Sequence, residues 1–124
     1  MIARHWRGWT KLSDAQAYER LLTDTVLPAL KNIEGYQGGY ILRQDDDREA
    51  EFVVINFFDS LDSVKRFAGD SYQTPVFEPE AKRLLSRIEN VAHHYEVRAR
   101  VHERELWRRP PRLIAPRVLP GRGR

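Results

Sequence analysis

Residues 51–58 read EFVVINFF, and this segment decides the fold because residues 52–58 are apolar in both strand registers except at Asn56. A strand with one face in water would alternate apolar and polar residues, so the pattern predicts a strand that is covered on both faces. The segment YQGGYILRQ, residues 36–44, precedes it across an acidic turn at residues 45–49. Together these segments predict a β-hairpin.

Strands and helices are also expected around this hairpin. Residues 2–9 (IARHWRGW) and 90–101 (NVAHHYEVRARV) predict a first and a last strand. A capping box at residues 13–16 predicts the start of a helix, which Pro28 should kink and Gly35 should end.

Two shorter helices are expected between the hairpin and the last strand. Asp59 and Ser60 can cap the first of them, which ends at Gly69. The second opens at residues 78–80 (EPE), where proline and acidic residues suit the first turn, and extends its apolar face to Ile88.

The order β-α-β-β-α-β predicts the fold class. It is typical of an α+β, ferredoxin-like unit, which has a four-stranded antiparallel sheet in the order 4-1-3-2. We expect right-handed crossovers, with strands one and three parallel to each other.

Helices in this topology cover only one face of the sheet. The other face would leave an apolar patch that reaches or exceeds the roughly 300–600 Å² that monomers usually show. We therefore expect two copies to pair back to back as a C2 homodimer, a dimeric α/β barrel. The alternative is that residues 102–124 fold over the bare face.

Charge is distributed unevenly along the 124 residues. From Arg98 to Arg124 nine arginines and two glutamates give +7, so residues 1–97 carry −4 of the net +3. An acidic body argues against nucleic acid as a partner. We divide the chain into a domain at residues 1–101 and an Arg- and Pro-rich tail at residues 102–124, which we expect to be partly disordered or packed on the partner subunit.

The composition also bears on location. The sequence contains no cysteine, no apolar run of the roughly 18–20 residues that cross a membrane, and no apolar signal segment after Met1. We expect a cytoplasmic protein with no membrane partner.

Four short passages carry a family resemblance: MIARHWRG at residues 1–8, GYQG at 35–38, FFDSL at 57–61 and HYEV at 94–97. Together they resemble the antibiotic biosynthesis monooxygenase-like proteins, a branch of the dimeric α/β-barrel group. The resemblance implies the same fold over residues 1–97. Members of that family include cofactor-independent monooxygenases of aromatic polyketides, haem-degrading enzymes and proteins with no assigned reaction.

The resemblance also bears on cofactors. Haem-degrading relatives need an axial histidine on the helical stretch before the last strand, a tryptophan on the second helix and an asparagine on the first strand. Residues 61–88 contain neither histidine nor tryptophan, and residues 2–9 contain no asparagine. We therefore expect no haem and no other cofactor. Cofactor-independent oxygenation instead needs an apolar cavity for a phenolic substrate and polar groups that stabilise the substrate anion.

Three polar residues are the candidates for that chemistry: Arg4, Asn56 and His94. Arg4 can neutralise an anionic substrate or pair with an acid such as Glu96. Asn56 needs a hydrogen-bond partner, either structural or a ligand. His94 titrates near neutral pH and is the candidate general base, or it belongs to a surface polar cluster. We expect an aromatic pocket wall made of Trp6, Tyr40, Phe58, Phe67 and Tyr72.

The remaining histidines do not predict a metal site. His93 and His94 are adjacent on a strand and point to opposite faces, so they cannot bind one ion together, and His5 with one of them lacks a third ligand. Two functions stay open: an oxygenase for an aromatic or hydrophobic small molecule, and a non-catalytic or regulatory barrel that binds such a ligand in the same place. Binding of nucleic acid through the tail is a third interpretation.

Overall fold

The hairpin and the first strand form the centre of the sheet. In a computed structural model, which describes residues 1–101, β2 (Tyr36–Asp45) pairs with β3 (Glu49–Phe58) and β3 pairs with β1 (Ile2–Lys11). The strand order β2-β3-β1-β4 is the predicted order 4-1-3-2. The predicted parallel arrangement of strands one and three is wrong, since β1 and β3 are antiparallel. The crossover through the first helical stretch keeps the chain direction from β1 to β2, and the hairpin then reverses it.

Two short strands share the edge beside β1. β4 (Leu85–Ile88) pairs with one end of β1 and β5 (His93–Glu96) with the other. The third helix therefore does not extend to Ile88, and the last strand does not span residues 90–101. Helix α4 (Pro79–Leu84) ends where Leu85 becomes extended. Pairing of β4 satisfies backbone groups of β1 that a continued helix would leave without partners.

The first helical stretch has three parts: α1 (Leu12–Leu21), η1 (Leu22–Val26) and α2 (Leu27–Lys31). The predicted capping box is wrong, because α1 begins at Leu12 and no side chain caps it. The predicted disturbance before Pro28 takes the form of the π-helical turn η1. There the N–H of Leu27 donates to the carbonyl of Leu22, five residues back, and this wider turn lies directly before the proline, which has no N–H to donate.

The cap of the second helix is confirmed. Helix α3 (Leu61–Ala68) follows Ser60, whose hydroxyl accepts a hydrogen bond from the N–H of Ser63, and ends at Gly69 with a φ of 83°. Ser60 thereby satisfies one of the N–H groups that the first helical turn leaves free.

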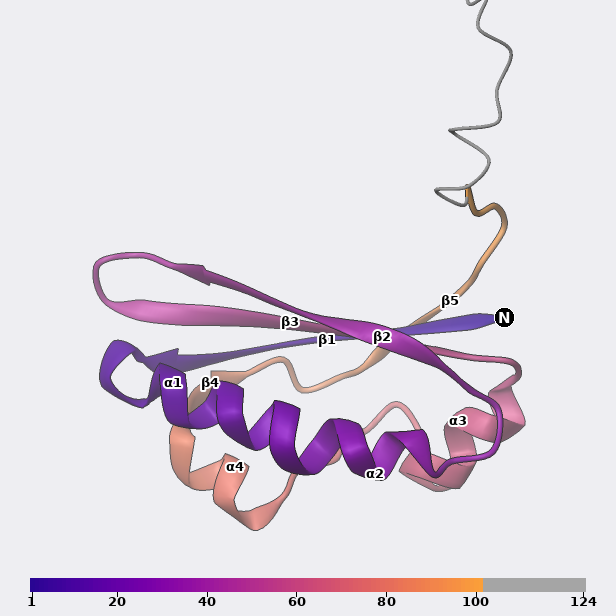
Figure 1. The fold of residues 1–124 in the computed structure, drawn as a ribbon, viewed down its shortest axis with the longest axis horizontal. Coiled ribbons are helices and arrows are strands. Elements are labelled where there is room, and N and C mark those ends of the chain that lie inside the picture. Colours follow the sequence, from indigo (N-terminus) through magenta and orange to yellow (C-terminus); the bar gives the residue numbers. More distant parts are fainter. Residues whose placement is uncertain (102–124) are drawn as a thin grey trace, which may run out of the picture.

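All helices lie on one face of the sheet (Figure 1). The side chains between the two layers form two clusters, one around Tyr18 and Phe52 and one around Leu30, Phe58 and Val64, and each of these five side chains is at most 2% exposed. The fold is therefore α+β with helices on a single side. Within residues 1–101, no helix has the length and apolar character needed to span a membrane.

The opposite face of the sheet carries no helix of residues 1–101 (Figure 1). At one end of it, residues of the segment 97–101 line a pocket together with Tyr40 and Phe57. Its apolar residues include Tyr40 and Leu42 on β2 and Tyr95 on β5, with 63%, 47% and 56% of their surface exposed. The predicted tail, residues 102–124, lies outside the described residues, so its role and the domain boundary stay predictions.

Two glycines with positive φ provide a test of how the chain enters β2. Gly35 has a φ of +93°, and a Cβ there would overlap the Ser63 hydroxyl and lie 2.5 Å from Asp59 Oδ1; Gly38 has a φ of +100° and open space around it. We expect Gly35→Ala to lower the free energy of unfolding by about 2–5 kcal/mol, from backbone strain plus the overlap. Gly38→Ala should cost only the backbone term, about 1–2 kcal/mol. Equal losses in urea unfolding would contradict this packing of residue 35.

Candidate functional site

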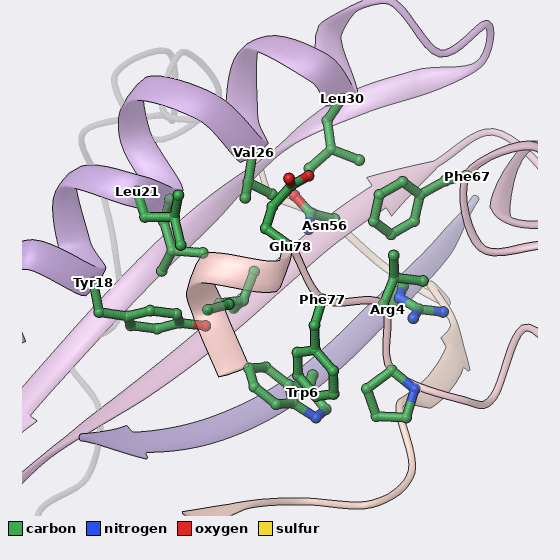
Figure 2. Close-up of a pocket in the computed structure, with 15 residues that line it drawn as sticks. Arg4, Trp6, Tyr18, Leu21, Val26, Leu30, Asn56, Phe67, Phe77 and Glu78 are labelled. Carbon is green, nitrogen blue, oxygen red and sulfur yellow. The ribbon is translucent and has the colours of Figure 1, made fainter. Parts of the chain in front are cut away.

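A cavity of about 60 Å³ lies between the helices and the sheet (Figure 2). Strands β1 and β3 form its floor, the first helical stretch and α3 form its sides, and residues 75–78 close it. Most of the lining is apolar. The lining residues are Arg4, Trp6, Tyr18, Leu21, Leu22, Val26, Leu30, Val54, Asn56, Phe67, Pro75, Val76, Phe77, Glu78 and Ala81.

The polar part of the floor is a cross-strand pair. Arg4 on β1 lies directly opposite Asn56 on β3, and each is 5% exposed. Alternation along both strands turns these two side chains toward the helices. Asn56 Oδ1 accepts a hydrogen bond of 2.7 Å from the Tyr36 hydroxyl. One of the two lone pairs of the amide oxygen is thus used, and its N–H groups are available to a ligand.

Arg4 is held by neutral partners. Its Nη1 donates to the carbonyl of Tyr72 at 2.5 Å and to His94 Nε2 at 3.1 Å, and its Nη2 donates to the carbonyl of Thr74 at 3.4 Å. The guanidinium also lies over the ring of Phe67, 5.5 Å from the centroid. Burial lowers the pKa of Arg4 to about 10, so the side chain stays charged at neutral pH.

His94 lies behind Arg4 and does not line the cavity. Burial and, next, the charge of Arg4 lower the pKa of His94 to about 4. The ring is therefore neutral at pH 7, and its Nε2 lone pair is already used by Arg4. The geometry makes His94 a hydrogen-bond acceptor for the guanidinium, which differs from both alternatives that the sequence left open, a general base and a member of a surface polar cluster.

Trp6 and the closing segment form the apolar end of the cavity. The indole Nε1 donates to the carbonyl of Glu89 at 2.8 Å, which fixes the ring, and the edge of Phe77 packs on it with 5.4 Å between centroids. Figure 2 shows the two rings in contact at one side of the cavity. Arg4 holds the residues just before the closing segment against β1 through the carbonyls of Tyr72 and Thr74.

The five predicted wall residues are distributed over different places. Trp6 and Phe67 line the cavity, whereas Phe58 is fully buried in the neighbouring core cluster. Tyr72 offers its carbonyl to Arg4, while its ring packs edge-on against His94, 5.0 Å between centroids. Tyr40 lies on the open face of the sheet, because it pairs with Ile55 and shares its orientation.

Sequence reasoning missed the helical and loop parts of the wall. Tyr18, Leu21 and Leu22 belong to an apolar helix stripe, which is the usual signal of a core and does not distinguish a core from a cavity wall. Residues 75–78 carry no periodic signal, so only the structure shows that they close the site.

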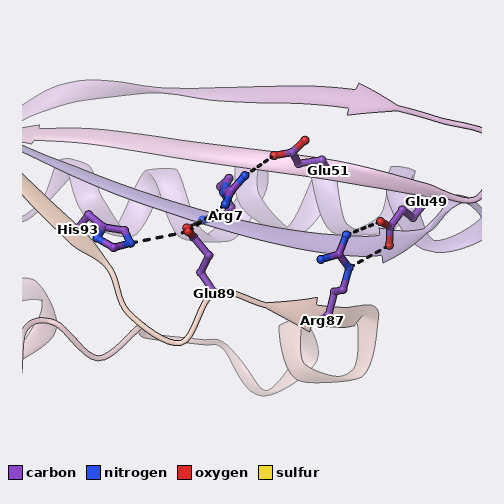
Figure 3. Close-up of polar contacts among 6 residues, drawn as sticks. All are labelled: Arg7, Glu49, Glu51, Arg87, Glu89 and His93. Atoms are coloured by element: carbon purple, nitrogen blue, oxygen red, sulfur yellow. Dashed lines mark hydrogen bonds and ion pairs between the residues drawn. The ribbon is translucent and has the colours of Figure 1, made fainter.

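A second cluster of polar side chains lies on the open face of the sheet (Figure 3). Arg7 bridges Glu51 at 3.4 Å and Glu89 at 3.3 Å, and Arg87 bridges Glu49 at 2.6 Å. Both guanidinium groups lie over the ring of Trp9, at 5.3 and 3.9 Å from its centroid. These arginines are already neutralised by acids, so their charges are not free for a ligand.

The histidines of the open face do not form a metal site. The rings of His5 and His93 are 6.5 Å apart between centroids, and His93 Nε2 lies 3.7 Å from Glu89. Within residues 1–101, no three histidine, aspartate or glutamate side chains are grouped so that they could hold a metal ion.

Comparison with solved structures finds this fold in two provisionally named antibiotic biosynthesis monooxygenases. One, from Deinococcus radiodurans, aligns with a TM-score of 0.60 and 14% identity over 82% of this chain and 97% of its own. The other, from Bacillus cereus, aligns with a TM-score of 0.55 and 13% identity over 82% and 96%. The chain has their fold. No protein-family model matches it, and no curated protein sequence does. At this identity the likeness establishes the architecture and leaves activity to the site.

The depressed pKa of His94 predicts a pH dependence of stability. In the unfolded chain His94 is protonated below the ordinary histidine pKa of about 6.5, whereas in the folded protein it is protonated only below about pH 4. The unfolded state then binds more protons, so the free energy of unfolding should fall as pH drops from 6.5 to 4. Urea unfolding at pH 7 and pH 4.5 measures this slope. His94→Gln should show a shallower slope than the wild-type protein, and identical slopes would contradict the burial of a neutral ring.

Proposed function

We propose that this chain is a small cofactor-independent monooxygenase of the antibiotic biosynthesis monooxygenase type, acting on an aromatic or hydrophobic small molecule. The observation that supports the proposal is the pair Arg4 and Asn56, which places hydrogen-bond donors on the floor of an otherwise apolar cavity. The fold shared with provisionally named monooxygenases agrees with it.

The proposed reaction needs charge stabilisation more than a protein base. An anthrone-like substrate loses a proton to solvent, and Arg4 and Asn56 stabilise the resulting oxyanion by charge-assisted hydrogen bonds. The anion supplies the electrons that reduce O₂, which adds to the ring carbon as a hydroperoxide. Loss of water then leaves a ketone, so one oxygen atom enters the product and the other leaves as water.

Substrate entry requires the closing segment to move. The cavity of about 60 Å³ is smaller than the roughly 300–1,000 Å³ of ordinary ligand pockets. The closing segment is part of residues 69–78, which join α3 to α4. This connection contacts Arg4 and Trp6 of β1, and its Gln73 carbonyl accepts from the N–H of Ala92, next to β5. The same small volume favours the second candidate, a non-catalytic protein that binds a small hydrophobic ligand in this cavity.

Oxygen uptake separates the two candidates. With metal-free protein and a panel of anthrone- and quinol-like phenols, we expect turnover that Arg4→Gln lowers at least about tenfold in kcat/KM, because the anion loses its charged partner. Arg43→Gln removes a matched charge that pairs with Glu19 and Asp45 away from the cavity, and it should leave the rate unchanged. Binding without oxygen uptake would favour the second candidate. If the protein showed neither binding nor oxygen uptake, both candidate functions would be contradicted.

We also propose that two copies pair through the open face of the sheet. The exposed Tyr40, Leu42 and Tyr95 lie on this face, with Val53 and Ile55 between them on the central strand. A second copy would remove these side chains from water, which is the dominant gain in association.

Sedimentation velocity tests this pairing. The wild-type protein should sediment as a dimer at micromolar concentration, and Leu42→Glu should dissociate it, because each interface would bury two unpaired carboxylates. Leu12→Glu, at an exposed position on the helical side, should remain dimeric. A wild-type monomer, or equal behaviour of the two variants, would contradict the arrangement.

A further inference from the structure

Arg4 differs from the other partly buried arginines in having no acidic partner. Its side chain is 5% exposed, yet no carboxylate of residues 1–101 lies within ion-pair distance of it. Arg7, Arg43 and Arg87 are more exposed, and each pairs with a glutamate or aspartate. A buried charge without a counter-charge is costly, and it is typical of sites whose counter-charge arrives with a ligand.

The guanidinium also retains donors. A guanidinium has five N–H groups, and the three hydrogen bonds to Tyr72, His94 and Thr74 leave two of them without a protein partner. Asn56 faces Arg4 across the strand pair and has free amide N–H groups, while Tyr36 donates to one of the two lone pairs of its oxygen. The floor of the cavity therefore offers mainly donors together with the positive charge of Arg4, which an oxyanion satisfies better than a neutral hydroxyl does.

The carboxylate of Glu78, on the loop that closes the cavity, limits the number of negative charges that a ligand can carry. Glu78 lines the same space, is exposed, and makes no ion pair with Arg4. A second negative charge on a ligand would approach this carboxylate. The cavity walls between the two groups are apolar.

From these contacts we infer that the cavity binds a small organic monoanion, an oxyanion on an apolar body, through Arg4, and that His94 is the residue that positions Arg4 for it. The inference rests on the proposed function for the location of the site and narrows its substrate class. It makes His94 a positioning residue that never touches the ligand.

The positioning role follows from the direction of the hydrogen bond. Arg4 can only donate, so His94 Nε2 must be the lone-pair acceptor and the ring proton lies on the buried Nδ1, next to the backbone of Ala92. The groups around His94 are Arg4 on β1, the neighbouring His93, and Tyr72, whose ring in turn lies under Lys65 of α3. None of these is an acid. If His94 took up a second proton, its Nε2–H and the N–H of Arg4 would both be donors, so their hydrogen bond would be lost. The guanidinium would then no longer be held in its fixed orientation.

Benzenesulfonate and methyl phenyl sulfone test the charge requirement, since they have nearly the same shape and only the first is an anion. It stays ionised throughout the pH range used. The readout is the indole N–H signal of Trp6 in a titration followed by NMR, with Trp9, on the opposite face, as an internal control. We expect the wild-type protein to bind the sulfonate at least tenfold more tightly than the sulfone, with Trp6 shifting and Trp9 unchanged. Equal affinities would overturn the inference.

Variants locate the effect. Arg4→Gln should abolish the preference for the sulfonate, and Arg4→Lys, which keeps the charge, should retain it at lower affinity. Thermal unfolding of each variant shows whether it is folded. If Arg4→Gln does not fold, the wild-type comparison of the two compounds still decides the question of charge.

The pH profile isolates His94. Because His94 takes up a proton near pH 4, the wild-type affinity for benzenesulfonate should fall about fourfold between pH 7 and pH 3.5. His94→Gln, whose amide oxygen can accept from Arg4 without titrating, should show no such fall. A parallel fall in both proteins would overturn the positioning role. These measurements do not involve oxygen. A preference for the sulfonate without oxygen uptake would support this inference and contradict the oxygenase. Oxygen uptake together with equal affinity for the sulfonate and the sulfone would support the oxygenase and contradict this inference.

Discussion

The antiparallel register of β1 against β3 is the constraint on which the rest of the structure depends. It places Arg4 opposite Asn56 and Trp6 opposite Val54, and the alternation of strand side chains sends these four toward the helices. The intervening residues, among them Arg7 and Trp9, point to the other face. A shift of one residue would exchange the two sets, which would expose the cavity floor and bury the ion pairs.

The arginines on the two faces of the sheet differ in whether acidic side chains neutralise them. On the open face Arg7 and Arg87 lie in a network with Glu49, Glu51 and Glu89, partly in contact with water, where such pairs contribute little to stability each. On the covered face Arg4 is buried among carbonyls and a neutral imidazole. Isolation of this one cation, more than the shape of the cavity, distinguishes the site from the rest of the core.

The cavity and the segment that closes it are connected through the same side chain. Arg4 presents donors to the cavity and holds residues 72 and 74 by their carbonyls, while Phe77 packs on Trp6. A ligand that accepts hydrogen bonds from the guanidinium therefore alters the contacts that hold the segment against β1. Through this connection, binding of a ligand to Arg4 would be coupled to closure of the site.

The sequence by itself determined the elements up to the third helix, the order of the strands, the capped second helix and the single covered face, because these depend on local patterns of apolar residues, prolines and capping side chains. It also marked Arg4 and Asn56, since a charge or an amide in a strand that must be buried is conspicuous, and it marked Trp6 as an aromatic wall residue. Tertiary structure alone decided the rest. The edge beside β1 became two short strands because β1 needed backbone partners along its length, and Tyr40 turned to the open face because the shift in register between Tyr36 and Gly39 fixed its orientation. The role of His94 depends on a contact between residues ninety positions apart, and no local pattern encodes which nitrogen accepts the hydrogen bond or how far burial lowers the pKa of the ring.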